Sequence, residues 1–155
     1  MPQAVDRLAS RRKALALFAG MPLALAACPV AAAPARLTFD ELYAKVGVLG
    51  LEFSSKVKML TGQDVAIRGF MAPPLKAEAM FFVLTEIPMA LCPFCSSDSD
   101  WPDNIIVVYL RRKQTFVQSG GLIEVHGRLE MGSWTDPETG FVSQLRLRDA
   151  EFASV

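Results

Sequence analysis

The chain has 155 residues, 52% of them hydrophobic, and its 16 basic side chains balance its 16 acidic ones. A net charge of zero argues against a nucleic-acid-binding surface, which usually carries a basic excess. Three cysteines are too few for a small scaffold built on disulfides. The length suits one domain.

Residues 1–35 have the pattern of an export signal. Arg11 and Arg12 precede the apolar run Ala14–Ala27, an arrangement that resembles a twin-arginine signal. The general secretory route is the alternative. The pattern predicts an exported, periplasmic protein.

Two processing sites compete at the end of this segment. Leu25-Ala26-Ala27-Cys28 resembles a bacterial lipobox, in which Cys28 would be lipid-modified. Small residues at 31–35 would instead permit ordinary signal-peptidase cleavage. The first site predicts a membrane-anchored lipoprotein and the second a soluble periplasmic protein.

Residues 36–60 predict a short helical lead-in. Thr38 and Glu41 have the spacing of a capping box, which starts a helix that Gly47 and Gly50 would end. Residues 53–60 predict a second short helix.

From residue 61 onward the pattern becomes β, because apolar and polar residues alternate or form short apolar runs. Two of these runs are almost entirely apolar, as expected for strands that are covered on both faces. Five strands are predicted, at 64–70, 80–84, 105–110, 122–131 and 141–147.

The predicted fold is mainly β: a small five-stranded OB-like Greek-key barrel at 61–155, preceded by one or two short helices. No helix is predicted between the strands, which argues against a parallel βαβ sheet. Gly69 and Gly127 lie in the middle of strands, where a small barrel needs bending or close backbone approach. An open five-stranded sheet or half-sandwich is the alternative.

The most informative local motif is Cys92-Pro93-Phe94-Cys95. Two thiolates at this spacing can supply half of the shell of Zn²⁺ or another soft transition metal. Asp98 and the single histidine, His126, are the candidates to complete that shell. The motif therefore predicts a metal site that is incomplete without side chains from elsewhere in the fold.

Two other interpretations of the cysteine pair stay open. A structural Cys92–Cys95 disulfide suits an oxidising compartment. A thiol–disulfide oxidoreductase is less favoured, because the acidic segment after Cys95, broken by Pro102, cannot form the long helix that lowers a catalytic thiol's pKa. No other catalytic arrangement is evident, so we expect a protein that is not an enzyme.

Several stretches together resemble an uncharacterised family of exported bacterial proteins, a domain of unknown function. The matching segments are Leu60–Pro74, Phe81–Leu84, Pro88–Cys95 and Val125–Leu147. The resemblance implies an OB-like barrel in the periplasm and relatives associated with ABC-type export or metal-handling systems. Many relatives have a cysteine, a histidine and prolines in place of Cys92–Cys95, so the position of the site is shared and its ligand set is not.

The sequence thus predicts a periplasmic binding protein that holds a transition metal, zinc or another, and serves a membrane transporter. In the alternative, the chain is a non-catalytic interaction module whose cysteines form a structural disulfide. An ABC-type transporter or another membrane protein is the expected partner, and nucleic acid is not.

Overall fold

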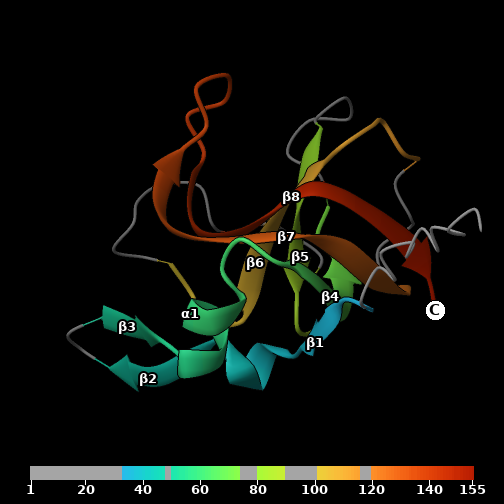
Figure 1. The fold of residues 1–155 in the computed structure, drawn as a ribbon. Helices are drawn as coiled ribbons and strands as arrows, with labels where there is room; N and C mark the ends of the chain where they lie inside the picture. The colour runs from blue at the N-terminus through green and yellow to red at the C-terminus, as the bar shows by residue number, and fades with distance from the viewer. Residues whose placement is uncertain (1–32, 48–49, 74–79, 90–100, 116–119) are drawn as a thin grey trace, which may run out of the picture. The chain divides into compact units, whose positions relative to one another are not determined.

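A computed structural model describes residues 33–47, 50–73, 80–89, 101–115 and 120–155, and Figure 1 draws their fold. Residues 1–32 of the expected export signal, including Arg11, Arg12 and Cys28, lie outside the described residues, whereas its last residue, Ala35, begins the first strand. Cys92, Cys95 and Asp98 also lie outside the described residues.

The described chain begins with short elements that precede the main strands. Strand β1 and the 3-10 helix η1 are followed by a two-stranded antiparallel hairpin and the helix α1. Their bounds are β1 Ala35–Leu37, η1 Phe39–Glu41, β2 Tyr43–Gly47, β3 Gly50–Phe53 and α1 Ser55–Leu60.

Both short helices are capped at their first turns, and the sequence predicts the first of these caps. Glu41 accepts a hydrogen bond from the Thr38 amide at 3.0 Å, which closes the expected capping box. Ser54 accepts from the Val57 amide at 3.1 Å and caps α1. The first helix is shorter than predicted, because the chain turns into the β2–β3 hairpin instead of continuing to Gly47.

Five longer strands follow, one at each predicted position. Their bounds are β4 Asp64–Met71, β5 Phe81–Thr85, β6 Ile105–Leu110, β7 Leu122–Thr135 and β8 Val142–Ser154. The last two are longer than predicted and form a curved antiparallel ribbon, drawn orange to red in Figure 1. The prediction of a mainly β protein is confirmed.

The main sheet has six strands, in the order β1-β4-β5-β6-β8-β7, and β4 also pairs with β7. The pairings of β1 with β4 and of β6 with β8 are parallel, and the others are antiparallel. Strand β1 was not predicted, because its three residues, Ala35–Leu37, are too few to establish a periodicity.

Strands β5 and β6 are buried along almost their whole length, as their apolar runs predicted. Phe82 and Leu84 belong to the main core of the sheet, with less than about a twentieth of their surface exposed. On the other face of these strands, Phe81 packs against the ring of Phe141 at 5.5 Å between centroids. The end of the β7–β8 ribbon therefore covers the second face.

Both mid-strand glycines lie where backbone and side chains approach closely, as expected. A Cβ at Gly69 would lie 2.6 Å from the Thr85 carbonyl oxygen, and one at Gly127 would lie 3.0 Å from the Arg148 carbonyl oxygen. Contacts that short would force the neighbouring backbone to move.

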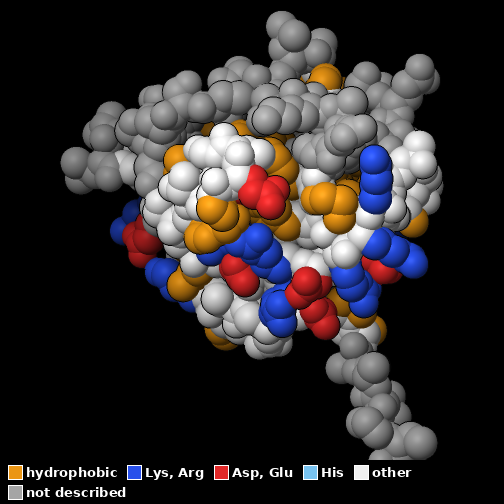
Figure 2. Space-filling view, turned by 90° about the horizontal axis from the view of Figure 1, so that it is seen from above, with side chains coloured by type: hydrophobic (Ala, Val, Ile, Leu, Met, Phe, Trp, Pro, Cys, Tyr) orange, Lys and Arg blue, Asp and Glu red, His pale blue; other side chains and the backbone are white. Residues whose placement is uncertain are grey.

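The surface carries both signs of charge in mixture. On the face in Figure 2, Lys and Arg side chains alternate with Asp and Glu, and hydrophobic side chains show between them. Within the described ranges, no helix has the length and apolar character needed to cross a membrane.

Candidate functional site

His126 is the one predicted ligand within the described residues. It lies on β7 opposite Ala66 of β4, and about half of its side chain is exposed. Its Nε2 lies 3.0 Å from Glu124 Oε1. In the described part of the chain, no three His, Cys, Asp or Glu side chains are grouped so that they could hold a metal.

Glu124 joins His126 to a cation on the neighbouring strand. The register of β4 and β7 places Arg68 directly opposite Glu124, and Arg68 Nε donates to Glu124 Oε2 at 2.6 Å. The hydrogen bond from Arg68, followed by that from His126, lowers the pKa of Glu124 below the ordinary carboxyl value. Glu124 is therefore a carboxylate at neutral pH.

The ionisation of Glu124 determines which nitrogen of the His126 ring donates a hydrogen bond and which can accept one. An ionised carboxylate only accepts hydrogen bonds, so His126 Nε2 must be the donor. The lone pair of a neutral ring then resides on Nδ1, which is left to accept a proton or bind a metal. A carboxylate that orients a histidine through its other nitrogen is common around protein metal ions.

A hollow of about 250 Å³ lies beside this network, where β1 and η1 meet β4 and β7. We call it the charged hollow. Leu37, Phe39, Ala66, Gly69 and Leu122 supply its apolar lining. Its other lining residues are Arg36, Thr38, Asp40, Arg68, Glu86 and Glu124.

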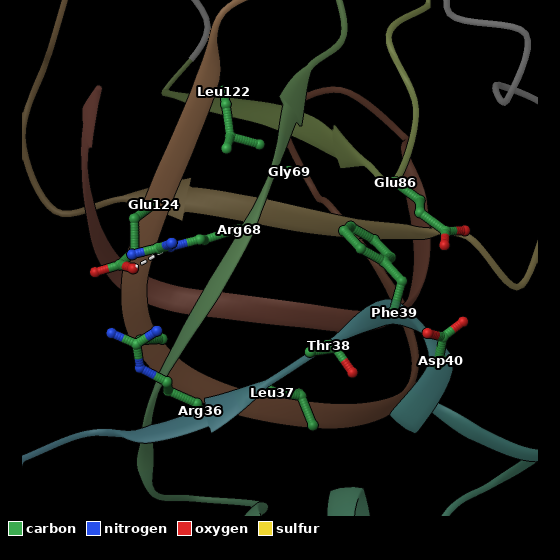
Figure 3. Close-up of a pocket in the computed structure, with 11 residues that line it drawn as sticks. Arg36, Leu37, Thr38, Phe39, Asp40, Arg68, Gly69, Glu86, Leu122 and Glu124 are labelled. Atoms are coloured by element: carbon green, nitrogen blue, oxygen red, sulfur yellow. Dashed lines mark hydrogen bonds and ion pairs between the residues drawn. The ribbon is translucent and has the colours of Figure 1, made fainter. Parts of the chain in front are cut away.

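Apart from the bonded pair Arg68 and Glu124, the charges around the hollow are separated by sign. Figure 3 shows Arg36, Arg68 and Glu124 at one end and Asp40 and Glu86 at the other, with Phe39 and Gly69 between them. Among the described residues, Arg36, Asp40 and Glu86 form no ion pair, whereas Arg68 is bonded to Glu124. The hollow thus has a basic end and an acidic end.

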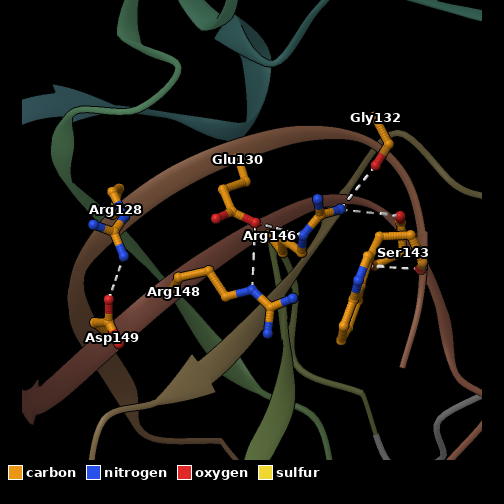
Figure 4. Close-up of polar contacts among 8 residues, drawn as sticks. Arg128, Glu130, Gly132, Ser143, Arg146, Arg148 and Asp149 are labelled. Carbon is orange, nitrogen blue, oxygen red and sulfur yellow. Dashed lines mark hydrogen bonds and ion pairs between the residues drawn. The ribbon is translucent and has the colours of Figure 1, made fainter. Parts of the chain in front are cut away.

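A second polar group lies on the β7–β8 ribbon, and we call it the arginine–aromatic cluster. Glu130 accepts from Arg146 Nε at 2.9 Å and from Arg148 Nε at 3.3 Å. Arg146, only 9% exposed, also donates to the Gly132 carbonyl at 2.8 Å (Figure 4). The cluster consists of Tyr109, Glu130, Trp134, Arg146 and Arg148.

The aromatic members of this cluster stack on its cations. The Arg148 guanidinium lies 4.0 Å from the centre of the Trp134 ring and 4.4 Å from that of Tyr109. Burial, and next the charge of Asp136, raise the pKa of Tyr109 well above its ordinary value. Its hydroxyl is buried and, within the described ranges, has no hydrogen-bond partner.

Side-chain hydrogen bonds hold residues on both sides of the segment 90–100, which carries Cys92 and Cys95. Before it, buried Thr85 Oγ1 donates to the Ile87 carbonyl at 2.7 Å, just after β5. After it, buried Trp101 donates from Nε1 to Tyr43 Oη at 2.8 Å. The two ends are thus attached to β5 and to the β2–β3 hairpin.

The charged hollow was not predicted from the sequence. Its residues come from β1, η1, β4, β7 and the turn after β5, and the capping box at Thr38 and the mid-strand Gly69 indicated local structure but no binding site. The cross-strand pair of Arg68 and Glu124 was the one available signal, and it needs the β4–β7 register to be recognised.

The comparisons with known proteins concern the fold. Neither a protein-family model nor a curated protein sequence matches this chain. The fold is similar to the crystal structure of a DUF3299 family protein (PA4066) from Pseudomonas aeruginosa PAO1. The TM-score is 0.52 at 13% sequence identity, over 79% of this chain and 97% of that one. At this identity the likeness shows a shared fold, and the neighbour itself belongs to a family of unknown function.

Proposed function

We propose that this chain is an exported periplasmic binding protein that holds a transition metal through Cys92 and Cys95, with His126 as a third ligand. Asp98 is the candidate for the fourth position. The protein delivers or senses this metal for a membrane transport system. The orientation of His126 by Glu124 is the observation that carries the proposal.

The scaffold in this proposal is an OB-like barrel made by β4 to β8. In its support, the pairings run β4–β5, β5–β6, β6–β8, β8–β7 and β7–β4, so they return to the first strand. The parallel contact between the third and fifth of these strands agrees with a Greek-key order. Such a barrel would hold a loop-borne site on a rigid base.

The state of His126 favours metal binding over a purely structural role. Its Nε2 is committed to the ionised Glu124, and Nδ1 is left as a lone-pair donor near the surface. The structural alternative, a histidine that serves only to bond Glu124, would not require Nδ1 to be accessible. About half of the His126 side chain is exposed, as a ligand that awaits a metal would be.

The proposal is tested by metal analysis of the exported protein, purified without a histidine tag. Wild type should contain a transition metal in stoichiometric amount, and Cys92→Ser/Cys95→Ser should lose it. His126→Gln should weaken binding, and Glu124→Gln should weaken it less, by about 10- to 100-fold, the usual effect of an orienting partner. Met59→Leu, which removes an exposed thioether sulfur outside the proposed site, is the control.

Three outcomes would contradict the proposal. Metal content that is unchanged in the double cysteine variant would place the site elsewhere. Absence of metal and of free thiols, with a lower melting temperature after reduction, would favour a structural disulfide. Thiols that cycle between oxidised and reduced forms with a dithiol reductant would favour an oxidoreductase.

A further inference from the structure

We propose that the charged hollow binds a small linear zwitterion, with the carboxylate of the ligand at Arg36 and Arg68 and its ammonium group at Asp40 and Glu86. This site shares Glu124 with the proposed metal site, but it contains none of the proposed metal ligands and needs no metal. The ligand class is that of short peptides and amino acids whose two charges are several bonds apart.

The basic end of the hollow is prepared for a carboxylate. Arg68 donates to Glu124 through Nε, and its terminal nitrogens have no other partner in the described part of the chain. These nitrogens therefore remain as donors. The short bond to Glu124 also fixes the orientation of Arg68, which reduces the ordering that binding would require. Arg36, exposed on β1 beside it, adds a second guanidinium.

The acidic end is complementary to a cation. Asp40 follows β1 on η1, and Glu86 follows β5, so two distant segments bring their carboxylates to one end of the hollow (Figure 3). Within the described ranges neither carboxylate has an ion-pair partner, so both remain to accept hydrogen bonds from an ammonium group of a ligand.

The middle of the hollow determines how far apart the two charges of the ligand must be. The ring of Phe39 and the backbone of Gly69 lie between the basic and acidic ends. Leu122, 39% exposed, adds a further apolar surface to the lining of the hollow. A ligand with both charges on one carbon atom could reach only one end, whereas a ligand with an apolar linker could reach both.

Gly69 is essential to this geometry. A Cβ at position 69 would lie 3.0 Å from Phe39 Cε2 and 2.6 Å from the Thr85 carbonyl oxygen. Glycine therefore lets the Phe39 ring approach the β4 backbone. The volume of about 250 Å³ lies just below the roughly 300–1,000 Å³ of pockets for drug-sized ligands, so the ligand must be smaller than these.

The test uses 6-aminohexanoate as the probe and the full exported chain as the protein. Hexanoate and hexylamine each carry one of its charges, and glycine carries both without the linker. Dissociation constants are measured by NMR titration, with the backbone amides of Gly69 and Leu122 as reporters. We expect 6-aminohexanoate to bind about tenfold or more tightly than each of the other three compounds, a difference of about 1.4 kcal/mol.

Variants that remove charge at one end of the hollow show which end binds the carboxylate of the ligand and which binds its ammonium group. Arg36→Gln should lower the affinity for 6-aminohexanoate toward that for hexylamine, because Arg68 alone then binds the carboxylate. Asp40→Asn/Glu86→Gln should reduce it to that for hexanoate. Arg112→Gln removes an exposed guanidinium outside the hollow and should leave the affinity unchanged. Equal affinities for all four compounds, or an equal loss in the Arg112 variant, would overturn the proposal.

The two proposals can fail separately. Cys92→Ser/Cys95→Ser should lose metal and still bind 6-aminohexanoate with wild-type affinity. Loss of zwitterion binding in that variant would overturn the claim that the hollow works without metal. Normal metal content in a protein that does not bind the probe would leave the metal proposal intact.

Discussion

The charged hollow and the arginine–aromatic cluster contain the same types of side chain and use them differently. In the cluster, Glu130 bonds both Arg146 and Arg148, and aromatic rings cover the guanidinium groups. In the hollow, Arg36 lines a ligand-sized space, and two carboxylates lie at its far end. Among the described residues, the guanidinium groups and the carboxylate of the cluster are paired with one another, whereas Arg36, Asp40 and Glu86 of the hollow form no ion pair.

This difference separates structural charges from charges that are available to a ligand. A buried charge is tolerated only with good partners, so the cluster stabilises the β7–β8 ribbon and depends on it. Exposed charges cost little when unpaired, because water solvates them. The hollow can therefore keep unpaired charges that a ligand could use, and its substitutions should affect binding more than stability.

The largest expected effect is the loss of the buried cation of the cluster. Arg146→Met would leave the Gly132 carbonyl without its donor and Glu130 with one guanidinium instead of two. We expect a decrease of about 2–4 kcal/mol in the free energy of unfolding, measured by urea denaturation. Arg36→Met should change it by less than about 0.5 kcal/mol. Similar losses in both variants would remove the distinction between the two regions.

A second test concerns the ribbon that carries the cluster. Gly127→Val would place carbon atoms about 3.0 Å from the Arg148 carbonyl oxygen and the Ala150 side chain. We expect a loss of about 1–3 kcal/mol in the free energy of unfolding. Gly47→Ala is the matched control, since no atom lies within 4 Å of the added carbon. A wild-type denaturant midpoint for Gly127→Val would argue against close packing of β7 on β8.

The chain has two tyrosines, and the pKa of each phenol can be measured by titration to test its burial. Burial raises the pKa of Tyr43 to about 12 despite its hydrogen bond from Trp101, and burial together with Asp136 raises that of Tyr109. A raised pKa means that the folded state favours the neutral phenol, so stability declines as the pH rises above about 10. Ultraviolet titration should show no tyrosinate near pH 10.5 until the protein unfolds. Ionisation of either tyrosine near pH 10 in the folded protein would contradict its burial.

The smallest expected effect concerns the exposed network at the hollow. Because the pKa of Glu124 is lowered in the folded state, its charge contributes stability above the ordinary carboxyl pKa of 4.5. That contribution is lost as the pH falls through the lowered value. Glu124→Gln should therefore be slightly less stable than wild type at pH 7 and equally stable in stronger acid. In a chain that already carries Arg68→Gln, Glu124→Gln should decrease the free energy of unfolding at pH 7 by a smaller amount, as measured by urea denaturation.

The longer strands could be predicted from the sequence because each has a strong local signal. The apolar runs at β5 and β6 indicated burial on both faces, and the mid-strand glycines indicated close contacts. The β2–β3 hairpin was missed because Gly47 and Gly50 were interpreted as the end of a helix. They are instead the paired residues at the hairpin turn.

The candidate sites were harder to predict, for two different physical reasons. The orientation of His126 depends on Glu124, two residues away on the same strand face, and that pairing is visible in the sequence once a strand is assumed. The hollow depends on which strands lie side by side. Arg36, Asp40 and Glu86 acquire a common role only through the pairing of β1 with β4 and of β4 with β5.

The strand order also has a consequence for synthesis of the chain. Asp64 on β4 pairs with Arg128 on β7, and Val107 on β6 pairs with Arg146 on β8. Contacts between residues so far apart in sequence form slowly, because a long loop must close first. While the ribosome makes the intervening residues, one edge of β4 has no partner from its own domain. Nascent chains of this protein would therefore be most prone to aggregation before β7 emerges, and a chaperone that covers that edge would have its greatest effect at this stage.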